Sequence, residues 1–181
     1  MNLRSSNDVP RAATLKKVAI YSAIFFIIAV AQCSFFANLT FLGVVPNLVI
    51  GAVAAISLFE SEHTSAVASI GAGFLTDALG GSGISISPLL FLSVALLLSA
   101  LSKKILKGFF PWILLLTVAN LFGIACTYLR LLISNTLPST ELLFKTIILP
   151  EFFYTLLFSL PLYFIFKFAA RLGETKGRFK I

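Results

Sequence analysis

Asp77 is the residue of this sequence whose chemistry most needs an explanation. It is the only acidic or basic side chain between His63 and Lys103, and the residues around it are mostly apolar or small. An aspartate at the centre of a membrane helix costs roughly 2.5–3.5 kcal/mol on insertion scales. We therefore predict that Asp77 is partnered, faces the interior of a helix bundle or lies near a membrane interface.

Two more charged residues, Arg130 and Glu151, fall within or at the start of apolar runs. If the chain crosses a membrane six times, all three charges reach a similar depth near the outer face. We predict a cluster in which Arg130 neutralises Asp77, Glu151 or both, because the guanidinium fork suits carboxylates. The alternative is that each side chain reaches the headgroups separately.

The polar residues give no pattern for a catalytic, cofactor or metal site. The only histidine, His63, lies in a short polar segment, and no serine or glycine motif fits a nucleophile or a phosphate cradle. Cys33 and Cys126 have no metal-ligand spacing and are interpreted as free thiols. We therefore predict that the protein is not an enzyme and holds neither a cofactor nor a metal.

Composition places these residues in a membrane. The 181 residues are 59% hydrophobic and 12% charged, with a mean hydropathy of +1.01, far from the values of soluble domains. The net charge is +7, but the basic residues lie beside apolar runs, where they set membrane topology. We expect an all-α integral membrane protein in contact with membrane lipid, and no nucleic-acid partner.

The apolar runs predict about six transmembrane helices in one bundle. Pro46 suits the first turn of a helix, and the glycines at 80, 81 and 83 indicate a helix break. Two runs are short for a crossing of about 30 Å. These two form either tilted spans or a re-entrant hairpin, and the sequence leaves both open. The predicted spans are residues 18–37, 46–59, 65–79, 84–101, 109–133 and 147–168.

Outside the membrane domain at residues 18–168 lie two polar tails, residues 1–17 and 169–181. Pro10 argues against a long helix in the first tail. With six crossings, all Lys and Arg residues except Arg130 and Lys145 fall in the tails, near the ends of the outermost spans or in the 103–107 loop, on one side. That side is predicted to be cytoplasmic, which places both termini in the cytoplasm. The 60–64 loop belongs to this side although it has no Lys or Arg.

Small residues in two of the predicted spans mark candidate faces for helix packing or for a partner. Ala19 and Ala23 form one small-xxx-small pair, and Gly71 and Gly73 are the glycines of the third span. Trp112, near two phenylalanines at the start of the fifth span, resembles an interfacial aromatic anchor.

Several of these features together resemble the rod shape-determining protein MreD family. They are Pro46-Asn47-Leu48 at the start of a short helix, the stretch GAGFLTDALGGSGIS at residues 71–85, and an apolar helix that ends in a Lys-Lys pair. The order of spans is also similar, so the resemblance covers residues 18–168. The serine-rich residues 82–88 depart from the simpler Leu-Gly turn that family members often carry there.

The resemblance implies a non-enzymatic bundle in the bacterial plasma membrane. Such a protein binds a single-pass MreC-like protein and helps couple MreB to a glycosyltransferase and a transpeptidase of lateral wall synthesis. Asp77 would be the family's acid after the glycine-rich helix, with a structural role. The alternative is a substrate-binding subunit of an energy-coupling-factor vitamin transporter, which is similar in size and span count. The outer loops offer few side chains to hold a vitamin.

Overall fold

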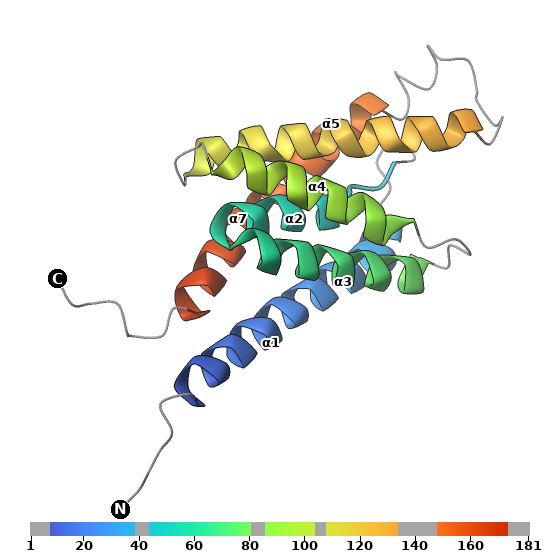
Figure 1. Cartoon of the computed structure of the whole chain (residues 1–181). Helices are drawn as coiled ribbons and strands as arrows, with labels where there is room; N and C mark the ends of the chain where they lie inside the picture. The colour runs from blue at the N-terminus through green and yellow to red at the C-terminus, as the bar shows by residue number, and fades with distance from the viewer. Residues whose placement is uncertain (1–7, 39–43, 81–85, 104–107, 134–147, 174–181) are drawn as a thin grey trace, which may run out of the picture.

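The computed structural model describes residues 8–38, 44–80, 86–103, 108–133 and 148–173, and these residues form a helical bundle (Figure 1). The predicted all-α fold is confirmed. The elements are α1 (Asp8–Val30), which continues as a π-helix η1 (Ala31–Phe36), then α2 (Leu48–Phe59), α3 (Glu62–Gly80), α4 (Ser87–Ser102), α5 (Phe109–Ile133) and α7 (Leu149–Gly173).

Helix α2 is the centre of the bundle. Every residue from Leu48 to Leu58 is buried, and α2 packs against α1, α3, α4, α5 and α7. A helix that is apolar on all sides is expected to lie inside a larger assembly. Its 12 residues span only about 18 Å at 1.5 Å per residue, so the short second helix that the sequence predicts is the core of the fold.

The N-terminus of α2 is largely buried, so its free backbone amides need partners within the protein. Gln32 Oε1 accepts the Val49 amide at 3.0 Å, and Asn47 Oδ1 accepts the Ile50 amide at 3.3 Å. The Asn47 amide itself donates to Thr155 Oγ1 of α7 at 2.9 Å. Three side chains from separate elements therefore hold the start of the central helix.

The six α-helices of the described chain alternate in direction. Tyr21, just past the middle of α1, stacks on Phe166 late in α7, and Phe59 at the end of α2 contacts Tyr163. At the opposite end, Phe36 contacts Phe158 of α7. In Figure 1 the starts of α1, α3 and α5 lie on the left with the ends of α2, α4 and α7. Helices α2 and α3 thus run between the two ends of the bundle in opposite directions.

Within the described residues, three helical segments are long and apolar enough to cross a membrane, namely Lys16–Phe36, Phe109–Cys126 and Leu149–Leu172. Helices α2 and α4 are shorter apolar helices. Helix α3 has 19 residues and extends beyond its predicted span, because Glu62, His63 and Thr64 form its first turn instead of a loop.

Two expectations about the ends of helices are wrong. Helix α1 begins at Asp8, so Pro10 does not prevent a long helix; it lies in the first turn, where a missing amide costs little. Trp112 is not an interfacial anchor, because its side chain is 0% exposed. It packs against Tyr163 with ring centroids 5.4 Å apart, which makes it part of the core.

Candidate functional site

Asp77 connects α3 to the start of α4. Its side chain is 8% exposed, and its Oδ2 accepts the backbone amide of Ser87, the first residue of α4, at 3.2 Å. The N-cap residue Ile86 makes no side-chain cap of its own. A carboxylate at this position satisfies a free amide and interacts favourably with the helix dipole. Asp77 therefore stabilises the helix that follows it.

Gly73 lets α3 and α4 approach closely at the same hairpin. A Cβ added to Gly73 would lie 2.3 Å from the Cα of Pro88, so no larger residue fits without movement of the backbone. Pro88 itself suits the first turn of α4. Gly73 and Asp77 thus both join α3 to α4, and a structural role accounts for these two residues.

The other two charges of the predicted cluster lie on different helices. Glu151 is partly buried in the first turn of α7, and Arg130 is in α5, with its side chain outside the described residues. Helix α3 packs mainly against α4, α1 and α2, whereas α5 packs against α2, α4 and α7. An ion pair between Arg130 and Asp77 or Glu151 stays a prediction.

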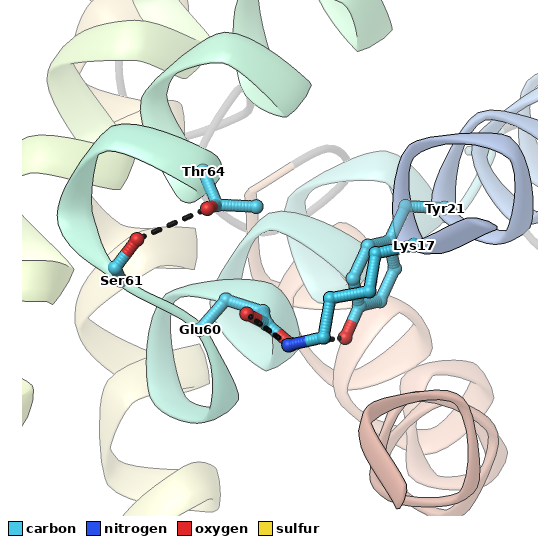
Figure 2. Close-up of polar contacts among 5 residues, drawn as sticks. All are labelled: Lys17, Tyr21, Glu60, Ser61 and Thr64. Carbon is cyan, nitrogen blue, oxygen red and sulfur yellow. Dashed lines mark hydrogen bonds and ion pairs between the residues drawn. The ribbon is translucent and has the colours of Figure 1, made fainter. Parts of the chain in front are cut away.

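A charged site lies at the end of the bundle where α1 meets the α2–α3 connection (Figure 2). Lys17 Nζ lies 3.0 Å from Glu60 Oε1, and the Tyr21 hydroxyl donates to the same oxygen at 2.7 Å. The side chains of Lys17 and Glu60 are 29% and 10% exposed. Glu60 is the C-cap residue of α2, so this contact fixes α1 to the central helix.

A second ion pair joins the same connection to α4. Lys103 donates to Glu62, and this hydrogen bond and the charge of Lys103 lower the pKa of the Glu62 carboxyl below its ordinary value. We call Lys17, Tyr21, Glu60, Glu62 and Lys103 the charged rim. It brings together the middle of α1, the end of α4 and the α2–α3 connection at one end of the bundle.

Behind the charged rim, a groove of about 570 Å³ opens between α1 and α3. We call it the α1–α3 groove. One wall comes from α1 and the other from α3, and polar side chains gather near the rim, where α3 begins. Its lining residues are Val18, Tyr21, Ser22 and Phe25 of α1, and His63, Thr64, Val67, Ala68, Gly71, Ala72 and Leu75 of α3.

The four small residues predicted to form packing or partner faces divide into separate surfaces. Ala19 and Ala23 are exposed on α1 and do not line the groove. Gly71 lines the groove, and a Cβ added there would meet no atom within 4 Å. Gly73 is buried against α4. Only Ala19, Ala23 and Gly71 are therefore open to a partner.

Sequence reasoning missed the charged rim and the groove. Glu60 lies 43 residues from Lys17, and nothing in the local pattern of either residue indicates the other. The 60–64 segment contains two acidic residues, Glu60 and Glu62, and is predicted to lie on the same side of the membrane as most Lys and Arg residues. Opposite charges at one end of a bundle could have suggested pairing.

Among the residues that the structure describes, no three His, Cys, Asp or Glu side chains gather as a metal site. Cys33 and Cys126 are both free thiols. Comparison with known proteins gives no match to a family model, to a curated protein or to a solved structure.

Proposed function

We propose that this protein is a non-enzymatic membrane scaffold of the bacterial rod-shape and elongation complex. In this role it binds a single-pass MreC-like protein and helps couple the MreB cytoskeleton to the glycosyltransferase and transpeptidase of lateral peptidoglycan synthesis. It resides in the plasma membrane with both termini in the cytoplasm. The proposal starts from the resemblance of residues 18–168 to the MreD family.

The observation that carries the proposal is the free outer face of α1. Of the three long apolar segments described above, the one in α1 is the least buried, with 22% buried against 33% in each of the other two. Ala19 and Ala23 lie on this face with the exposed side chains of Phe26 and Ile27. Small residues beside large ones let a second helix approach closely in a membrane. A partner's single transmembrane helix fits such a face.

The charged rim supports the proposed orientation. The 60–64 segment has no basic residue of its own, but Glu60 and Glu62 are paired with Lys17 and Lys103. The segment therefore lies at the end of the bundle that carries the basic residues. By the positive-inside rule this end faces the cytoplasm.

Co-purification from native membranes in mild detergent, followed by mass spectrometry, tests the proposal. We expect a single-pass MreC-like protein and wall-synthesis enzymes to remain bound to the wild type. Replacing Ala19 and Ala23 together by Leu is expected to reduce their recovery by roughly tenfold, equivalent to about 1.4 kcal/mol. The matched control is Ala100→Leu with Ala125→Leu, two exposed alanines on α4 and α5.

Equal recovery from the Ala19/Ala23 variant and from the control would remove α1 as the docking helix. Recovery of ATP-binding subunits, or of a bound small molecule, would instead favour the vitamin-transporter alternative. That alternative requires several polar groups converging in an apolar pocket. The described groove opens near the charged rim, the proposed cytoplasmic end, whereas a vitamin site would be expected at the outer loops.

A further inference from the structure

Helix α1 carries a row of residues spaced alternately three and four positions apart, as in the seam of a coiled coil. We call this row the α1 seam, and its residues are Val9, Ala12, Lys16, Ala19, Ala23, Phe26 and Val30. Residues at this spacing lie along one side of a helix. All of them except the lysine are apolar or small, which is the pattern of a helix that packs against a second helix over several turns.

The bundle does not use the α1 seam. The inward side of α1 is formed by Tyr21, Phe25 and Ile28, which are buried. At about 100° per residue, the seam lies on the opposite side of the helix. Of the seam side chains that the structure describes, Val30 is partly buried and the exposed ones are Lys16, Ala19, Ala23 and Phe26.

The surroundings of α1 leave room for another helix. In Figure 1, α1 forms the lower edge of the bundle, and no other described helix lies below it. None of the seam residues lines the α1–α3 groove, so the seam is a separate surface. A helix placed against it would contact this protein through α1 and would leave the packing of the bundle unchanged.

Two adjacent lysines of α1 differ in their partners. Lys17 forms an ion pair with Glu60 and fixes α1 to the central helix. Lys16 is exposed in the seam, and within the described part of the chain it has no ion pair or hydrogen bond. A single charged residue in an otherwise apolar seam selects the partner, because it disfavours an apolar residue or a like charge at the facing position.

Lys16 argues against a second copy of this chain as the partner. Two copies in one membrane have the same topology, so a symmetric pair through the α1 seam would place the two Lys16 side chains at the same level, facing each other. Like charges in such a contact repel, whereas a carboxylate at the facing position attracts the lysine. The charge therefore favours a helix from a different protein, with an acidic residue at the level of Lys16.

We propose that the α1 seam binds one transmembrane helix of another protein, and that this helix carries Asp or Glu near its cytoplasmic membrane boundary, opposite Lys16. Ala19 and Ala23 allow the two backbones to approach closely, and Phe26 and Val30 complete the contact deeper in the membrane. The inference rests on the proposed function in that it specifies the partner helix of the scaffold. It does not require that this partner belong to wall synthesis.

Photo-crosslinking of the full-length protein in native membranes tests this proposal. Benzoylphenylalanine replaces Phe26 in the seam or, as the matched control, Phe110, an exposed phenylalanine of α5. We expect only the probe at position 26 to cross-link to one other membrane protein. Mass spectrometry of the captured segment should show a transmembrane helix with Asp or Glu within about one turn of its cytoplasmic end.

A charge swap then tests the pairing itself. Lys16→Glu should lower the yield of the cross-link by roughly tenfold, whereas Lys16→Arg should retain it. Replacing the acidic residue of the captured helix by Lys should restore the yield in the Lys16→Glu variant. Thermal unfolding of the purified variant verifies that the bundle is intact, and Lys16→Gln replaces Lys16→Glu if that variant does not fold.

Several results would overturn the proposal. They are the absence of a cross-link from position 26, a captured helix without an acidic residue at that level, and a yield that does not change in Lys16→Glu. A disulfide between two copies of Ala23→Cys, in a background without Cys33 and Cys126, would assign the seam to a second copy.

The same experiment separates this inference from the proposed function. Capture of a helix that has the acidic residue and passes the charge swap, but belongs to a protein unrelated to wall synthesis, would support the inference and contradict the scaffold function. Capture of an MreC-like protein with a yield that does not respond to Lys16→Glu would do the reverse.

Discussion

The carboxylate of Asp77 accepts the backbone amide of Ser87 at 3.2 Å, so the last turns of α3 hold the first turn of α4. The two residues are 10 positions apart on either side of the glycine-rich connection. The contact gives a buried acid a structural purpose, because the amide at the start of a helix has no partner within that helix.

Replacing Asp77 by Ala should destabilise the protein by roughly 0.5–2 kcal/mol, the usual cost of losing an N-terminal helix cap. Asp77→Asn keeps an oxygen acceptor and should retain most of the stability. The free energy of unfolding in mixed micelles measures both. If Asp77→Asn is as destabilising as Asp77→Ala, the negative charge matters more than the hydrogen bond, and the capping account is incomplete.

Gly73 and Gly71 should respond in opposite ways to the same substitution. Gly73→Ala forces a Cβ against the backbone of Pro88 and should cost about 1–3 kcal/mol, as for other overpacked sites. Gly71→Ala meets open space and should stabilise the helix by up to about 1 kcal/mol. Thermal unfolding in detergent measures the pair, with Gly71→Ala as the control. Equal effects would contradict the close approach of α3 and α4.

The contact between α1 and Glu60 should depend on both of its donors. Glu60→Ala removes the hydrogen bonds from Lys17 and Tyr21 and should cost about 1.5–3 kcal/mol, the range for hydrogen bonds to charged groups. Tyr21→Phe removes one hydroxyl and should cost about 1 kcal/mol. A double-mutant cycle of Lys17 and Glu60 isolates their coupling. Additive losses would mean that the pair does not hold α1 in place.

The approximate positions of the helices could be predicted from sequence because several apolar runs end at a clear stop, although α1 and α3 begin earlier than predicted. Glu60 ends the run of α2, and the glycines from residue 80 end that of α3. The central position of α2 could also have been predicted, because its 12 residues are all apolar or small, with one serine. Such a helix has no polar face to expose to water or to headgroups.

Contacts between distant residues could not be predicted in the same way. Trp112 lies near two phenylalanines, a pattern that is typical of a membrane interface. In the structure, however, its ring packs against the ring of Tyr163. Gln32 accepts the Val49 amide only because η1 ends beside the start of α2. These pairings depend on how the helices pack in three dimensions. A pattern along the chain predicts which face is apolar but not which neighbour will cover it.

The ion pair between Glu62 and Lys103 predicts a pH dependence. Because Lys103 lowers the pKa of Glu62 in the folded protein, the pair stabilises the protein above the pKa that Glu62 has in the unfolded chain. This contribution is lost as the pH falls through the lowered folded pKa. Thermal midpoints of the wild type and of Glu62→Gln should therefore differ near neutral pH and converge in acid. A constant difference across this range would exclude the linkage.

The alternating directions of the helices predict which positions share a side of the membrane. In a background without Cys33 and Cys126, Ser61→Cys and Lys103→Cys should react with a membrane-impermeant maleimide from the same side, because both lie at the charged rim. Ile86→Cys, at the start of α4, should react only from the opposite side. Spheroplasts and inverted vesicles provide the two sides. Labelling of Ser61→Cys and Ile86→Cys from one side would mean that α3 does not cross the membrane, because these positions flank that helix.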